Sequence, residues 1–254
     1  MSAAQKSNYD IIENYYIYGW SGAECLLNYN QIKQLAYALF LTNRYGFRLR
    51  NFPDPMDKKR LRLEYSQKLL RRLNISVRVE NADKLPKEGQ YLLFSNHRSI
   101  IDPLVIDIAL KERDIFGLWV AKKELYNSLF FGMAIRHGGC VRVDREKHQP
   151  SHFFSDIKQG LSEGSSIFIF PEGTRNKGSK VLLPFKDGMR IIAIKNRLPM
   201  LPVYIQTHTG EVLGRALKEK SIQQEVVIMF GDMISHKEKR DPEAIYREMF
   251  GLGR

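Results

Sequence analysis

The sequence predicts an α/β protein with a mostly parallel central sheet of about seven strands flanked by helices. Two observations predict this class. From residue 74 onward, short apolar runs alternate with segments of helical length. Two of these runs, 91–94 and 166–170, lead directly into polar loops, as buried strands of a parallel sheet do. The chain has 254 residues, of which 43% are hydrophobic, enough for one large domain or a core domain with an appendage.

The region before residue 74 has a different character. Residues 1–50 are dense in tyrosine, tryptophan and phenylalanine, and their spacing predicts helices at about 9–25 and 31–48. We expect residues 1–73 to form an N-terminal helical segment at a membrane interface.

A third helix, expected at 57–73, is the clearest amphipathic segment. Its apolar positions recur every four residues at Leu61, Tyr65, Leu69 and Leu73. Its other face is strongly basic, which suits a helix lying on an anionic membrane surface. The alternative is that the stripe packs on the protein's own core and the basic face is only solvated.

Residues 74–254 are expected to form the α/β domain. The candidate strands are 75–79, 91–94, 115–120, 141–143, 166–170, 200–205 and 225–230. The candidate helices are 104–110, 123–136, 151–162, 186–197 and 242–250. Their alternation indicates helices covering a parallel sheet.

Composition narrows the functional classes. The chain has 40 Lys and Arg against 28 Asp and Glu, a net charge of +12, which favours an anionic partner. Cys25 and Cys140 form neither a metal-ligand pattern nor a disulfide framework, so we expect a reduced, cytosolic environment. The polar start predicts no signal peptide, and no apolar run is long enough to predict a spanning helix.

The loop 95–103 contains the first candidate catalytic group. His97 and Asp102 follow an apolar strand, and Asp102 and Pro103 suit the N-cap and first turn of a helix. Imidazole is a common general base near neutral pH, and a carboxylate on its second nitrogen fixes the tautomer. The alternative is an N-cap aspartate and an unlinked surface histidine.

Two more strand ends carry polar groups. Phe170–Arg175 combines a glycine that permits close backbone approach with an arginine suited to phosphate. The loop 142–145 adds further basic side chains. Each alone reads as an ordinary turn with a solvated arginine, but three such loops in one α/β domain favour a shared site.

Other catalytic patterns are excluded. Gly160–Gly164 matches the G-x-S-x-G nucleophile elbow, but a helix precedes it and a strand follows, the reverse of what that elbow needs. There is no P-loop, dinucleotide fingerprint or zinc spacing, so we expect no cofactor and no metal. A base and an anion site without a protein nucleophile indicate transfer of a group onto a substrate hydroxyl, with His97 taking its proton.

These motifs resemble those of the glycerolipid acyltransferases, the 1-acyl-sn-glycerol-3-phosphate (lysophosphatidic acid) acyltransferase family. Asn96–Asp102 resembles the family's N-H-x-x-x-x-D motif, and Phe170–Arg175 is similar to its F-P-E-G-T-R motif without a mismatch. Residues 139–145 resemble a third block, although Arg142 stands where an aromatic is usual. Further similar blocks are 122–125, 184–188 and 201–203, so the resemblance runs in the family's order over roughly residues 75–205.

The resemblance implies acyl-CoA or acyl-carrier protein as donor and lysophosphatidic acid as acceptor, with phosphatidic acid as product. His97 would be the general base, oriented by Asp102. The expected substrate-binding residues are Asn96, Arg145, Glu172, Gly173, Thr174, Arg175 and Lys186. Backbone amides near Gly173 or in the 96–102 turn would stabilise the oxyanion.

The resemblance also implies a monotopic location on the cytoplasmic face of the cell membrane, anchored by the helices at 9–48 and 57–73. Two alternatives stay open. One is the same chemistry on glycerol-3-phosphate or another lysolipid. The other is a non-catalytic basic module that binds lipid or nucleic acid, but no nucleic-acid motif is present and we expect no nucleic-acid partner.

Overall fold

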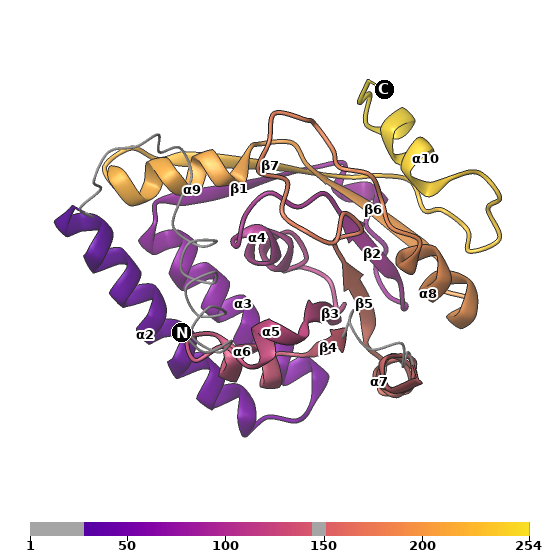
Figure 1. The fold of residues 1–254 in the computed structure, drawn as a ribbon, viewed down its shortest axis with the longest axis horizontal. Helices are drawn as coiled ribbons and strands as arrows, with labels where there is room; N and C mark the ends of the chain where they lie inside the picture. Colours follow the sequence, from indigo (N-terminus) through magenta and orange to yellow (C-terminus); the bar gives the residue numbers. More distant parts are fainter. Residues whose placement is uncertain (1–27, 144–150, 254) are drawn as a thin grey trace, which may run out of the picture.

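A seven-stranded sheet covered by helices on both faces forms the centre of the computed structural model, which describes residues 28–143 and 151–253 (Figure 1). The strand order is β1-β7-β6-β2-β5-β3-β4, and every neighbouring pair is parallel except β6 with β7. This confirms the predicted fold class. The strands are β1 Ile75–Glu80, β2 Leu92–Ser95, β3 Gly117–Lys122, β4 Cys140–Val143, β5 Ser166–Ile169, β6 Met200–Ile205 and β7 Gln224–Phe230.

The helices are α2 Tyr29–Arg50, α3 Pro55–Arg72, α4 Asp102–Ala109, α5 Lys123–Tyr126, α6 Gly132–His137, α7 Ser151–Ser162, α8 Gly188–Asn196, α9 Thr209–Lys218 and α10 Pro242–Met249, with a short 3₁₀ helix at Ala82–Lys84. Capping residues in the sequence explain where two helices begin. Asn28 forms a capping box at the start of α2. Asp54 is the N-cap of α3, and Pro55 is the first residue of that helix. The helix predicted at 9–25 lies outside the described residues.

One helix prediction was wrong, and one helix was missed. The single helix expected at 123–136 is two short helices, α5 and α6, because the Ser128 hydroxyl accepts the backbone N–H groups of Phe130 and Phe131 and closes a turn. Helix α9 was not predicted at all. Gly210 and Gly214 lower its intrinsic helix propensity, so its formation depends on burying an apolar face that includes Val212.

The helices form two layers, each with its own apolar cluster. One cluster joins α2, α3, α4 and α9 to one face of the sheet. The second joins α7, α8 and α10 to the other face. Figure 1 shows α2 and α3 on one side of the sheet and α7 and α8 on the opposite side. The sheet is therefore buried on both faces, as the apolar runs of its strands require.

Helix α3 belongs to the core. Leu61, Leu69 and Leu73 are all buried, in the same cluster as residues of the sheet. The expectation that this stripe inserts into a membrane was therefore wrong, because the stripe already covers the protein's own sheet. The alternative reading, a stripe packed on the core, is the one the structure shows.

A buried ion pair fastens α3 to the α/β region. The Arg62 guanidinium contacts the Asp107 carboxylate of α4 and donates a 2.7 Å hydrogen bond to the Gly117 carbonyl of β3. Both charged side chains are almost fully buried, and removing one partner of such a pair typically costs about 3–5 kcal/mol. Helix α3 and the sheet share one apolar cluster. The predicted domain boundary after residue 73 stays a prediction.

The described helices also bear on the membrane question. Within residues 28–143 and 151–253, none is both long and apolar enough to cross a bilayer.

Candidate active site

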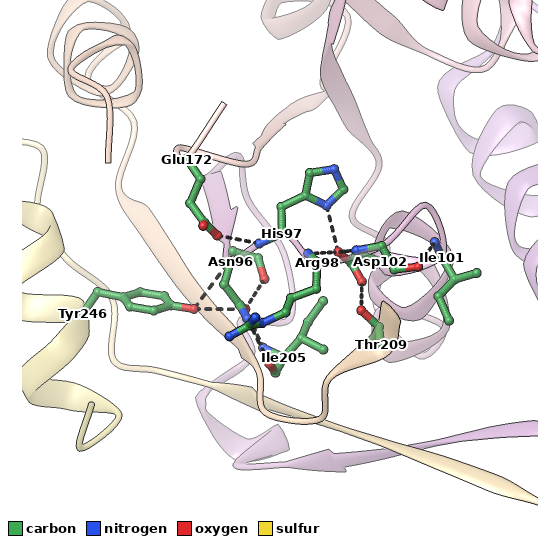
Figure 2. A network of polar contacts seen from close by, with 11 residues as sticks. Asn96, His97, Arg98, Ile101, Asp102, Glu172, Ile205, Thr209 and Tyr246 are labelled. Atoms are coloured by element: carbon green, nitrogen blue, oxygen red, sulfur yellow. Dashed lines mark hydrogen bonds and ion pairs between the residues drawn. The ribbon is translucent and has the colours of Figure 1, made fainter. Parts of the chain in front are cut away.

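Three neighbouring parallel strands, β6, β2 and β5, end at the same edge of the sheet. The loops that follow them carry His97, Glu172 and, at the start of α9, Thr209. Figure 2 shows these side chains converging on the turn between β2 and α4. The carboxyl ends of parallel strands are where open α/β sheets place their ligands, so this edge is the candidate site.

His97 and Asp102 are in direct contact. The His97 Nδ1 lies 2.7 Å from the Asp102 Oδ2, and the two side chains are 18% and 1% exposed. The other ring nitrogen points away from the carboxylate in Figure 2. The alternative of an unlinked surface histidine therefore does not hold. A half-buried imidazole held at one nitrogen and open at the other has the geometry of a general base.

Asp102 does not cap the helix as predicted. It is the first residue of α4, and the N-cap position belongs to Ile101. Its Oδ2 also accepts the backbone N–H groups of Arg98 (2.6 Å) and Ser99 (2.8 Å). Its Oδ1 accepts the hydroxyl of Thr209 (Figure 2). The carboxylate oxygens therefore bind the loop before α4 and Thr209, and not the backbone N–H groups of the first turn of α4.

Glu172, which was expected to contact substrate, is hydrogen-bonded to the protein backbone. It is 2% exposed; its Oε1 accepts the His97 N–H at 2.7 Å and its Oε2 accepts the Leu183 N–H at 2.9 Å. Burial raises the pKa of Glu172 to about 7, against the opposing effect of these two hydrogen bonds. Each oxygen thus accepts one backbone N–H, and one of these bonds ties Glu172 to the backbone of His97. Contact between Glu172 and the acceptor stays a prediction.

Asn96 has a similar structural use. Its side-chain amide donates to the Ile205 carbonyl (3.0 Å) and accepts from the Ile205 N–H (2.8 Å), which ties the end of β2 to the end of β6. The Tyr246 hydroxyl completes this buried group and also donates to the Val203 carbonyl (Figure 2). Asn96 therefore links the ends of the two strands, and its predicted contact with substrate stays a prediction.

The remaining predicted residues lie on the loop after β5 or outside the described residues. Gly173 has φ +68°, a conformation that favours glycine and explains its place in the turn. Thr174 is exposed and Arg175 is half-buried beside it. Lys186 is exposed, and its backbone N–H donates to the Pro171 carbonyl. Arg145 lies outside the described residues. That this group binds phosphate stays a prediction.

Comparison with known proteins gives a family match. A family model described as Acyltransferase matches residues 76–206, which contain both motif loops. The chain belongs to the acyltransferase family.

Curated relatives in this family share part of the chain. A 1-acyl-sn-glycerol-3-phosphate acyltransferase from Helicobacter pylori is 37% identical over 118 residues, which cover 46% of this chain and 48% of that protein. One from Streptococcus pneumoniae is 30% identical over 65% of this chain and 58% of that protein. The chain thus spans about half the length of these relatives.

A solved structure supports the fold. The 1-acyl-sn-glycerophosphate acyltransferase of Thermotoga maritima matches with a TM-score of 0.61 over 88% of this chain and 90% of that chain, at 23% identity. At this identity the likeness shows the acyltransferase fold, and the chemistry has to be argued from the residues themselves.

The structure adds residues that sequence reasoning missed. Thr209 was missed because α9 was not predicted, and nothing in the local sequence links it to a loop 107 residues earlier. Arg98 was passed over as an unspecified motif position. Its guanidinium donates to the carbonyls of Gly178, Lys180 and Val181, which holds the loop after β5 against the catalytic loop.

The described part of the chain offers neither a reactive thiol nor a metal-ligand cluster. Burial raises the pKa of the Cys140 thiol to about 12, so the nucleophilic thiolate does not form near neutral pH. No group of three or more His, Cys, Asp or Glu side chains in residues 28–143 and 151–253 could hold a metal ion.

We predict that Thr209→Val lowers kcat for acyl transfer roughly 10-fold, because it leaves the buried Asp102 Oδ1 without its donor while keeping the side-chain shape. Thr209→Ser retains the hydroxyl and should stay within about threefold of wild type. Steady-state kinetics of both variants, with melting temperatures as the folding control, measure this. Equal activity of the Val and Ser variants would contradict it.

Proposed function

We propose that this protein transfers a fatty acyl group from a thioester donor to the free hydroxyl of lysophosphatidic acid and so forms phosphatidic acid. The observation that carries the proposal is the His97–Asp102 contact, in which the carboxylate is fixed from four directions and the second imidazole nitrogen points away from it. The acceptor is inferred from the curated relatives, which are named 1-acyl-sn-glycerol-3-phosphate acyltransferases. Acyl-CoA or acyl-carrier protein provides the thioester.

The reaction needs no covalent enzyme intermediate. The acceptor hydroxyl oxygen attacks the thioester carbonyl while His97 Nε2 removes its proton. Asp102 stabilises the imidazolium that forms. The tetrahedral intermediate then collapses: the carbon–sulfur bond breaks, and the leaving thiolate takes the proton back from His97. Each proton and electron pair is accounted for, and the base returns neutral.

Charge recognition would place the acceptor. Its phosphate is dianionic or nearly so, and a guanidinium matches phosphate with paired hydrogen bonds. Arg175 lies on the same loop as Glu172, three residues further along the chain. Glu172 accepts a hydrogen bond from the backbone N–H of His97. A phosphate bound by Arg175 would therefore be held on the same rigid unit as the base. Rigid placement of both reactants is a large part of catalysis by proximity.

We further propose that the outer face of α2 rests on the cytoplasmic surface of the cell membrane. Phe40 and Phe47 are 61% and 58% exposed, and Ile32 lies on the same side of the helix. The exposed Lys33 and Arg44 interleave with these apolar side chains. An apolar stripe with flanking cations is what an interfacial helix needs to bind anionic lipids.

His97→Ala tests the enzymatic proposal. We expect it to lower the rate of lysophosphatidic acid acylation by at least about 10³-fold, because the proton acceptor is lost. Wild type and variant are assayed with labelled acyl-CoA and acyl-carrier protein against lysophosphatidic acid, glycerol-3-phosphate and other lysolipids, with products resolved by mass. His152→Ala, an exposed histidine on α7, is the matched control and should keep full activity.

Two outcomes contradict the proposal. Undiminished acylation by the His97 variant overturns the assignment of the base. A wild-type protein that acylates none of these acceptors supports a non-catalytic lipid-binding module instead.

The membrane proposal is tested by flotation with vesicles that contain phosphatidic acid and phosphatidylglycerol. Phe40→Ser with Phe47→Ser should lower the apparent binding constant at least about 10-fold, since two large apolar side chains no longer leave water. Ile191→Ser with Ile194→Ser, exposed on α8 of the other layer, is the control and should leave binding unchanged. Equal effects of the two pairs would refute a specific α2 face.

A further inference from the structure

One residue of the second motif has no part in the reaction described above. Phe170, the first residue of Phe170–Arg175, follows β5, and its ring lies against the imidazole of His97. The ring centroids are 3.9 Å apart and the planes differ by 9°. This is a close parallel stack rather than an incidental edge contact.

Phe170 is itself supported from behind. Its ring also stacks on the indole of Trp119, with centroids 4.8 Å apart and planes 18° from parallel. Two near-parallel rings at these distances fit only on opposite faces of Phe170. Trp119 in turn meets the edge of Phe168, with centroids 5.3 Å apart at 75°. His97, Phe170, Trp119 and Phe168 thus form a continuous aromatic series that joins the loop after β2 to β3 and β5.

We propose that Phe170 is a positioning residue for His97. Its ring holds the plane of the imidazole and stabilises the imidazolium formed during acyl transfer. The proposal rests on the proposed function, since it concerns the proton that His97 accepts there. It assigns to Phe170 a role distinct from substrate binding.

The orientation of His97 needs a second constraint. Its hydrogen bond to Asp102 fixes one nitrogen but permits the ring to tilt about that contact. A flat ring 3.9 Å from the imidazole blocks that tilt on one side. Together the two contacts define both the position and the plane of the base, and so the direction in which its free nitrogen points.

The stack also favours one charge state of the reaction. The face of a phenyl ring carries partial negative charge and attracts a cation within about 6 Å of its centroid. His97 is neutral before the proton transfer and cationic as the tetrahedral intermediate forms. The attraction is therefore stronger in the transition state than in the substrate complex, so its loss lowers kcat rather than raising KM.

Trp119 supports this arrangement through its ring face. It is only 8% exposed, and its indole N–H finds no acceptor among the residues that the structure describes. A buried donor without a partner is unfavourable, so hydrogen bonding does not explain this side chain. Gly117 makes room for the next ring: a Cβ there would lie 2.3 Å from the Phe168 ring. Trp119 and Phe168 belong to the apolar cluster on one face of the sheet, and Phe170 packs against it.

Two substitutions at one position test the proposal. Phe170→Leu keeps an apolar side chain but removes the ring, and Phe170→Tyr keeps the ring. We expect Phe170→Leu to lower kcat about 10-fold and to leave KM within twofold of wild type. We expect Phe170→Tyr to keep kcat within about threefold of wild type. Phe154→Leu, a half-buried phenylalanine on α7, is the matched control and should leave both constants unchanged.

Proton NMR reports the stack without substrate. The carbon-bound ring protons of His97, assigned by comparison with His97→Ala, should resonate upfield because of the ring current of Phe170. They should move downfield in Phe170→Leu and stay in place in Phe170→Tyr. Unshifted His97 signals in the wild-type protein would overturn the stack itself.

The kinetic outcomes separate this proposal from the function on which it rests. A Phe170→Leu variant that loses the upfield shift but keeps kcat overturns the positioning role and leaves the acyltransferase proposal standing. A rise in KM at constant kcat overturns it as well, because Phe170 then binds substrate. A wild-type protein that transfers no acyl group overturns the proposed function and this role together.

Discussion

The buried carboxylate of Asp102 is the interaction on which the rest of the site depends. A charge removed from water must be matched by donors, or the folded state bears a large desolvation cost. Asp102 meets that requirement with four donors: one ring nitrogen, two backbone amides and one hydroxyl. Each donor is fixed in return, so the same contacts that make the charge tolerable also immobilise His97.

The sheet explains why those donors are available in one place. Strands β6, β2 and β5 are parallel neighbours, so their following loops meet at one edge although they are far apart in sequence. Glu172 joins the loop after β5 to the backbone of His97, and Asn96 joins the end of β2 to that of β6. His97 lies in a loop, not in a helix or strand. Contacts from the loops after β2, β5 and β6 hold it in place, directly or through Asp102.

Several features could be read from the sequence because they depend on local pattern. The apolar runs predicted all seven strands, and the turn before α4 predicted that His97 and Asp102 lie close together. Contacts set by tertiary structure could not be read in this way. The pattern does not show which backbone groups a polar loop residue contacts, so the backbone contacts of Asn96 and Glu172 could not be predicted. The stripe containing Leu61 had the same ambiguity between lipid and core.

The central claim is that His97 and Asp102 act as one unit, and a double-mutant cycle on kcat/KM tests it most directly. The cycle compares wild type, His97→Ala, Asp102→Asn and the double variant in acyl transfer to lysophosphatidic acid. If Asp102 acts through His97, the double variant is about as slow as His97→Ala alone, because the carboxylate has nothing left to orient. If the two losses multiply instead, the residues act independently, and the account of a histidine base held by a buried carboxylate is contradicted.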